Sequence, residues 1–286
     1  VGVSSSGSTI EGYNTGDVSG TADNVGGLVG WAKKISVTGY NEGTINGKGV
    51  DIGGLLGLAD ESTVEGYNKG TVTGENNIVG GLVGVAQNSS TVTGYNTGAV
   101  IGKKAYVGGL TGYLAGSTLT GYKVGNVSGE GQNVGGLAGL ADTSTVIGYN
   151  TETITGENNV VGGLVGVAQN SSTVTGYNTG ETKGKQYVGG LTGYLAGSTV
   201  TGYNTGDVTG TSYYIGGLAG YLTGSTVTGY NSGDVSEKSY FGGLAGYKNN
   251  ATLTGFVVKK SSDGETLVVD YEGMNADKKD QELATA

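Results

Sequence analysis

The stretch GGLVGVAQNSSTVTGYNTG occurs twice in this chain, letter for letter, at 80–98 and again at 162–180. A second stretch, VGGLTGYLAGST, is also written twice, at 107–118 and 188–199. A block of about 80 residues has therefore been duplicated. A catalytic site gains little from being copied, whereas a structural unit gains length. The duplication favours a building block over a reactive site.

A shorter repeat lies inside this block. Gly-Gly-Leu triplets recur at steps of 26 to 28 residues, and they begin at Gly26, Gly53, Gly80, Gly108, Gly135, Gly162, Gly189, Gly216 and Gly242. A Gly-Tyr pair follows the same period, with Phe256 in the tenth place. Repeats of this length are typical of solenoids and propellers. The chain therefore consists of one unit written about nine times.

Each unit contains three runs that are rich in β-branched and aromatic residues and are separated by Gly, Asn and Ser. One unit shows them at 78–86, 90–96 and 98–102. This pattern predicts strands, and no helical period is sustained. A unit of three short strands cannot bury its own apolar face, but stacked units can. We therefore predict an all-β, three-sided β-solenoid (β-helix) of about nine to ten coils with repeats of ~27 residues.

The repeat pattern divides the chain into three parts. Residues 1–255 carry the solenoid repeats, and residues 256–273 read as a hairpin that caps the last coil. The turn of this hairpin would be Ser262-Asp263-Gly264. Residues 274–286 are polar and are predicted to be a flexible tail.

The alternation of residues in STVTGYN assigns directions to the side chains. Val92 and its equivalents are always aliphatic and should point inward, whereas the Thr, Glu or Ile before the Gly should point outward. By the same alternation the Asn column points inward, where its amides can form a ladder. The Tyr column points outward and supplies the candidate binding or ladder residues, namely Tyr13, Tyr40, Tyr67, Tyr95, Tyr122, Tyr149, Tyr177, Tyr203 and Tyr230.

The strand that contains Gly-Gly-Leu is apolar on both faces. Three positions after the Leu of each triplet, apolar residues such as Val85 and Tyr113 form its second face. Such a strand is either covered by another segment or forms a flat association surface. Its glycines would let two backbones or sheets approach closely.

The residues that are missing exclude several classes of function. The 286 residues include 62 Gly but no His, Cys, Arg or Pro, and the formal net charge is −9. Without His and Cys, the usual ligands of zinc, iron and copper and the common nucleophile pairs are absent, so we expect no metal, no cofactor and no enzymatic activity. A negative chain without Arg is a poor ligand for nucleic acid. No apolar run has the length that insertion into a membrane requires.

The recurring GGLxG followed by GYNxGxV resembles the GLUG repeat family, and the resemblance covers residues 9 to 255. Many units of that family have Cys before the Tyr, where this chain has Gly. GLUG repeats are found in large bacterial surface and secreted proteins, including adhesins and IgA-peptidase-type proteins. The resemblance implies a repeat region of an exported protein, at the bacterial cell surface or secreted, with a role in cell adhesion. Its partners would be a host or neighbouring-cell surface protein or glycan, or another copy of the chain.

Two other functions compete with a structural or adhesive role. The exposed Tyr column could stack on the sugar rings of a glycan, or its rings could simply stack on one another. Thr-x-Thr pairs such as Thr91/Thr93 and Thr173/Thr175 would form two outward columns, an arrangement that suits an ice-binding surface. Thr is also an ordinary residue of exposed strands. Glu11, Glu65 and Ile147 interrupt the columns.

Overall fold

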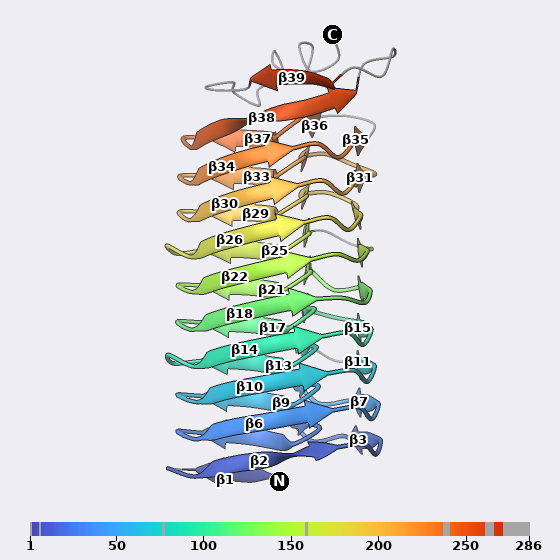
Figure 1. The fold of residues 1–286 in the computed structure, drawn as a ribbon, viewed down its shortest axis with the longest axis vertical. Coiled ribbons are helices and arrows are strands. Elements are labelled where there is room, and N and C mark those ends of the chain that lie inside the picture. Colours follow the sequence, from blue (N-terminus) through green and yellow to red (C-terminus); the bar gives the residue numbers. More distant parts are fainter. Residues whose placement is uncertain are drawn as a thin grey trace.

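The fold is an elongated stack of coils (Figure 1), shown by a computed structural model that describes residues 2–5, 7–75, 78–157, 160–236, 241–260 and 266–270. The N-terminal strands lie at one end of the stack and the C-terminal strands at the other. The described residues form strands and turns and include no helix. The all-β prediction is therefore confirmed.

Two of the four sheets consist of the longer strands of each coil. Sheet A has ten strands, β1 (Val3–Ser5), β5 (Val29–Lys33), β9 (Leu56–Asp60), β13 (Val83–Gln87), β17 (Thr111–Ala115), β21 (Ala138–Asp142), β25 (Val165–Gln169), β29 (Thr192–Ala196), β33 (Ala219–Thr223) and β37 (Ala245–Asn249). Sheet B has eleven strands, β2 (Thr9–Asn14), β6 (Ser36–Asn41), β10 (Thr63–Asn68), β14 (Thr91–Asn96), β18 (Thr118–Lys123), β22 (Thr145–Asn150), β26 (Thr173–Asn178), β30 (Thr199–Asn204), β34 (Thr226–Asn231), β38 (Thr252–Lys260) and β39 (Thr266–Asp270).

The other two sheets consist of shorter strands. Sheet C has nine, β3 (Val18–Gly20), β7 (Ile45–Gly47), β11 (Val72–Gly74), β15 (Val100–Gly102), β19 (Val127–Gly129), β23 (Ile154–Gly156), β27 (Thr182–Gly184), β31 (Val208–Gly210) and β35 (Val235–Ser236). Sheet D also has nine, β4 (Asn24–Gly26), β8 (Asp51–Gly53), β12 (Ile78–Gly80), β16 (Tyr106–Gly108), β20 (Asn133–Gly135), β24 (Val160–Gly162), β28 (Val188–Gly189), β32 (Ile215–Gly216) and β36 (Phe241–Gly242).

Successive coils pair in parallel, and each residue lies over its counterpart in the next repeat. Between β10 and β14, for example, Tyr67 pairs with Tyr95 and Asn68 with Asn96. The β-solenoid with a repeat of about 27 residues is thereby confirmed. Its repeat period places every sequence column in one straight row along the rod.

The number of strands in a coil differs from the three-sided prediction. The run 78–86 is divided into β12 and β13, so each coil has four strands. The division falls at Gly81-Leu82, between the two strands. A Cβ atom on Gly80 would collide with the carbonyl oxygen of Val83. The chain therefore turns there so tightly that only glycine fits.

Two hydrophobic cores run along the rod. The larger core lies between sheets A and B and contains the Leu of each Gly-Gly-Leu triplet together with the inward Val of sheet B, such as Leu82 and Val92, both 0 % exposed. The smaller core lies between sheets C and D and contains residues such as Ile45 and Val79. Inward residues of the sequence pattern, Val92 included, occupy the larger core as predicted.

Sheet D covers part of the second apolar face of sheet A, whereas the tyrosines on this face stay partly exposed. Val85, Leu140 and Val167 on this face are only 5 to 8 % exposed. A Cβ atom on Gly84 would lie 2.7 Å from the backbone nitrogen of Ile52 in sheet D. Since a side chain at this place would separate the strands, glycine permits sheet D to pack directly on sheet A.

The C-terminal end of the described chain departs from the repeat. Strand β39 pairs with β38 in antiparallel fashion, with Val257 opposite Val269. It lies over the last coil of sheet B, in the region where the sequence predicts a hairpin (Figure 1). The predicted turn at Ser262-Asp263-Gly264 and the tail at 274–286 lie outside the described residues.

The glycine before each Tyr allows a test of the stacking. Gly94 has a φ of 152°, and a Cβ atom there would collide with the carbonyl oxygen of Gly66 in the adjacent coil. We expect Gly94→Ala to lower the free energy of unfolding by about 3–5 kcal/mol, because it combines backbone strain with a steric clash.

Gly12 provides the matched control, because it occupies the same column but would have no atom within 4 Å of an added Cβ. Gly12→Ala should leave stability nearly unchanged. Urea denaturation followed by circular dichroism measures both variants. Equal effects of the two substitutions would contradict the stacking argument.

Candidate functional site

The candidate residues of the Tyr column lie together on the outward face of sheet B. All nine predicted residues from Tyr13 to Tyr230 form one row, and neighbouring rings are 4.8 to 5.2 Å apart between centroids with interplanar angles of 2 to 9°. Phe256 continues the row at 5.1 Å from Tyr230. In-register pairing of the strands positions every ring.

Stacking determines which parts of these rings other molecules can reach. Every ring from Tyr40 to Tyr230 has a neighbouring ring on both of its faces. These inner rings are partly exposed, whereas Tyr13 at the end of the row is 66 % exposed. A sugar ring that stacks on tyrosine needs a free aromatic face. This arrangement therefore favours a ladder over a glycan platform.

Columns of Thr lie beside the Tyr column on the same sheet. The side chains of Thr91, Thr93, Thr173 and Thr175 are exposed, and each pairs with its counterpart in the next coil. Ile147, which is 44 % exposed, interrupts one of the columns. The outward face of sheet B thus consists mostly of hydroxyl groups and ring edges, with single interruptions such as Ile147.

The Asn column lies inside the coil and forms a ladder of side-chain amides. Asn41 is fully buried, and its Nδ2 donates hydrogen bonds to Oδ1 of Asn68 at 2.6 Å and to the carbonyl oxygen of Gly43 at 2.7 Å. The same pattern recurs in other coils, for instance from Asn204 to Asn231 at 2.8 Å. These amides therefore join the corners of adjacent coils through hydrogen bonds.

Lys123 interrupts this ladder. Its side chain is fully buried, and Nζ donates a hydrogen bond to the carbonyl oxygen of Gly98 at 2.7 Å. Oδ1 of Asn150, in the following coil, has no hydrogen-bond donor within the described part of the chain. Burial lowers the pKa of Lys123 to about 7, an effect that the charge of Glu152 opposes.

Two carboxyl groups also have shifted pKa values, but they lie in other coils. Burial, with a contribution from the charge of Asp23, raises the pKa of Asp51 to about 6. Desolvation acts to raise the pKa of Asp142, but the hydrogen bonds from Asn170, Gln169 and Thr143 together bring it below its ordinary value. A general acid and base must act on one substrate, and these groups belong to separate regions of the rod.

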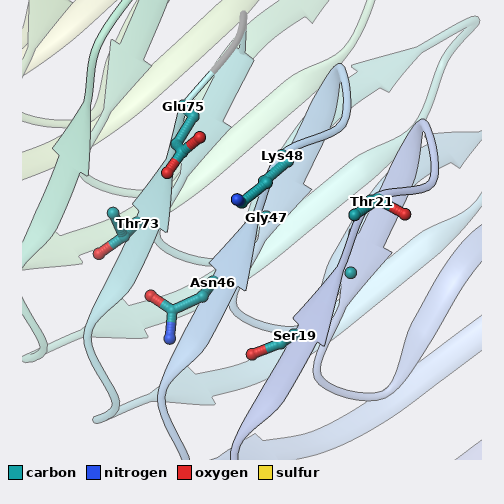
Figure 2. A pocket seen from close by; sticks show the side chains of 8 residues that line it. Ser19, Thr21, Asn46, Gly47, Lys48, Thr73 and Glu75 are labelled. Atoms are coloured by element: carbon teal, nitrogen blue, oxygen red, sulfur yellow. The ribbon is translucent and has the colours of Figure 1, made fainter.

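A shallow groove lies on the outward face of sheet C (Figure 2). Its volume is about 290 Å³, and the outward side chains of three consecutive strands line it, namely Ser19, Asn46 and Thr73, with Thr21, Lys48 and Glu75 in the turns beyond them. Hydroxyl, amide, ammonium and carboxylate groups here could hydrogen-bond to a small polar molecule. Sequence reasoning missed this groove, although the polar outward positions of the Val-x-Gly strands could have indicated it.

The described residues contain no group of three or more His, Cys, Asp or Glu that could hold a metal ion. Within the same residues, no helix has the length and apolar character needed to cross a membrane.

Comparison with known proteins gives no relative. No family model, no curated protein and no solved structure matches this chain. The resemblance to GLUG repeats therefore stays a prediction.

Lys123 leads to a prediction about pH. The unfolded chain keeps the lysine proton up to its ordinary pKa of 10.5, whereas the folded chain releases it above about 7. Between these values the unfolded state binds more protons, so the stability of the wild type rises with pH. Lys123→Asn would remove the buried cation and restore the amide ladder, and we expect this variant to be more stable than the wild type at pH 6.

The difference in the free energy of unfolding between Lys123→Asn and the wild type should shrink by about 1.4 kcal/mol per pH unit above pH 7. Urea denaturation from pH 6 to 9.5 measures it. Lys185→Asn removes a positive charge from an exposed lysine and serves as the control for the loss of one charge. A constant difference for Lys123→Asn would show that the buried amine does not titrate in this range.

Proposed function

We propose that this chain is a non-enzymatic structural and adhesive repeat region of an exported bacterial surface protein. It serves as a stiff rod that presents the outward face of sheet B to a partner, which is a surface protein or glycan of a host or neighbouring cell, or a second copy of the chain. The proposal places the protein at the cell surface or in the secreted fraction, as the resemblance to GLUG repeats implies.

One observation carries the proposal: the same kinds of interaction join successive coils along the rod, with one break in the Asn ladder at Lys123. Backbone ladders in four sheets, the buried Asn amides and the stacked Tyr rings all run along the same axis. Because the four sheets and the Tyr row continue through successive coils, bending the rod would strain several of them together. Such a body suits spacing and presentation.

The alternative of an enzyme finds little support in the chemistry of the side chains. Lys123, Asp51 and Asp142 have perturbed pKa values, yet they belong to different coils. Buried Lys123 has its Nζ engaged with a backbone carbonyl group. Catalysis needs such groups at one place and within reach of substrate.

The rod model predicts that whole coils can be removed without loss of the fold. Deletion of residues 81–162 joins Gly80 to Gly163, and because 80–98 and 162–180 are identical, the repeat continues unchanged across the junction. We expect a folded rod that is shorter by about 14 Å, three times the strand spacing. Small-angle X-ray scattering measures the maximum dimension. An aggregated or unfolded product would argue against independent stacking of coils.

The adhesive role is tested by displaying the chain on a non-adherent bacterium. Attachment to cultured epithelial cells and clumping of the bacteria are then counted. A triple variant with Thr93→Lys, Thr175→Lys and Thr201→Lys adds charge to the exposed face of sheet B, and we expect it to abolish attachment or clumping.

The matched control places lysines on another face, where the repeat itself already has Lys183 at the outward position of sheet C. Asn46→Lys, Ser128→Lys and Thr155→Lys occupy the same column. These changes should leave attachment intact. If wild-type cells neither attach nor clump, the adhesive part of the proposal fails, whereas the rod remains.

The competing functions have separate readouts. A glycan-binding module would bind immobilised glycans and lose this binding when Tyr149→Ala opens the Tyr column. An ice-binding protein would show thermal hysteresis that depends on the exposed Thr pairs, of which Thr173/Thr175 and Thr199/Thr201 follow one another without interruption. Absence of hysteresis at millimolar protein would reject that function.

A further inference from the structure

The stacked Tyr column has a property that spacing and adhesion do not require. It forms an unbroken row of oxidisable side chains, in which eight consecutive contacts join Tyr13 to Tyr230 at 4.8 to 5.2 Å between ring centroids. Nearly parallel planes bring the π-systems of neighbours face to face. The row therefore spans about 40 Å, from eight steps of the strand spacing.

We propose that the Tyr column conducts oxidising equivalents along the rod, by transfer of a tyrosyl radical from ring to ring. This activity is independent of the adhesive function. It concerns only the nine tyrosines of the column and any one-electron oxidant that reaches one of them.

The chemistry of each step is balanced as follows. An external one-electron oxidant takes an electron from one phenol, whose hydroxyl proton passes to water, and a neutral tyrosyl radical remains. The next phenol along the column then gives an electron to this radical and a proton to water, while the first oxygen takes a proton from water. One phenol is restored and one radical has moved by a single coil.

The protonation state of the column suits this reaction. Partial burial and the charges of the adjacent tyrosines raise the pKa of Tyr122 and of Tyr177 above the ordinary value of 10.0. At neutral pH these two phenols therefore start with their protons. Hydroxyl groups at the surface of sheet B let this proton exchange with solvent.

Phe256 marks one limit of the row. Its ring continues the stack at 5.1 Å with an interplanar angle of 5°, but a benzene ring without a hydroxyl group has no proton to release and is much harder to oxidise. The radical consequently stays between Tyr13 and Tyr230. The same stacking shows that Phe fits the column, so Tyr→Phe substitutions can interrupt conduction while they keep the packing.

A second group of aromatic rings provides an internal comparison. Tyr194, Tyr221 and Tyr247 stack on the outward face of sheet A, and Tyr187 packs at a steep angle against Tyr194 and Tyr221. The larger hydrophobic core separates this group from the outward face of sheet B. Substitutions there alter tyrosine content without touching the column.

The test exploits the absence of Cys from the sequence. Thr228→Cys creates a single thiol at an exposed position of β34, on the same face as Tyr230, and a ruthenium(II) polypyridyl complex is attached to it. Illumination with a cobalt(III) pentaammine acceptor, which is reduced irreversibly, produces ruthenium(III) beside Tyr230. A nitroso spin trap is present in the solution, and adducts are located by mass spectrometry of tryptic peptides.

The readout is the adduct on Tyr13, the only tyrosine of the peptide 1–33. In the labelled protein with an intact column we expect adducts at Tyr13. Adding Tyr122→Phe and Tyr149→Phe should abolish them, while adducts at Tyr230 persist. The control pair Tyr194→Phe and Tyr221→Phe should leave the yield at Tyr13 unchanged.

Transfer between molecules is measured by mixing the labelled protein that carries the two Phe substitutions with unlabelled wild type. Adducts at Tyr13 in this mixture would measure the intermolecular contribution, which is subtracted. If the interrupted and intact columns give equal adduct yields at Tyr13 after this subtraction, or if the intact column gives none, the proposal is overturned. Circular dichroism of each variant verifies the fold.

Discussion

In-register stacking of coils is the constraint on which the rest of this structure depends. Parallel strands at a spacing of about 4.8 Å place each residue directly over its counterpart in the next repeat. Any residue type in the unit therefore becomes a column, as with Tyr67 over Tyr95 and Asn68 over Asn96. A column of buried polar groups is stable only if its members form hydrogen bonds to one another, as Asn41, Asn68 and Asn96 do. A column of rings at the same spacing stacks face to face.

Close stacking of the coils also requires glycine. Backbones approach so closely at the corners and between sheets A and D that a single methyl group would meet a neighbouring coil, as it would at Gly80 and Gly84. The high content of Gly is thus the consequence of close contacts between backbones, not of disorder. Because these contacts repeat, many equal interactions join the coils, and this regularity is the basis for proposing a stiff rod with a presenting surface.

The chemical properties that differ between coils come from positions where one repeat departs from the others. Lys123 occupies an Asn position and brings a cation into a buried ladder, where burial lowers its pKa to about 7. Burial raises the pKa of Asp51 to about 6, with a smaller contribution from the charge of Asp23 in the previous coil. The groove on sheet C arises where polar residues such as Asn46 and Thr73 occupy outward positions of adjacent coils. These differences between repeats distinguish one coil from another, although their common fold is the same.

Sequence alone was sufficient for the solenoid, its period, the inward direction of Val92 and Asn96 and the outward direction of Tyr95, because alternation along a strand and repetition between strands are properties of the letters themselves. Four strands per coil, the contact of sheet D with sheet A and the burial of Lys123 required the tertiary structure. A period of two residues defines faces within a strand, but it does not reveal where Gly80 lets the chain turn back. Nor does it show that the rings of the Tyr column cover one another, since this depends on the angle between each ring and the axis of the rod. Such angles and turns are set by packing between coils, which no single repeat contains.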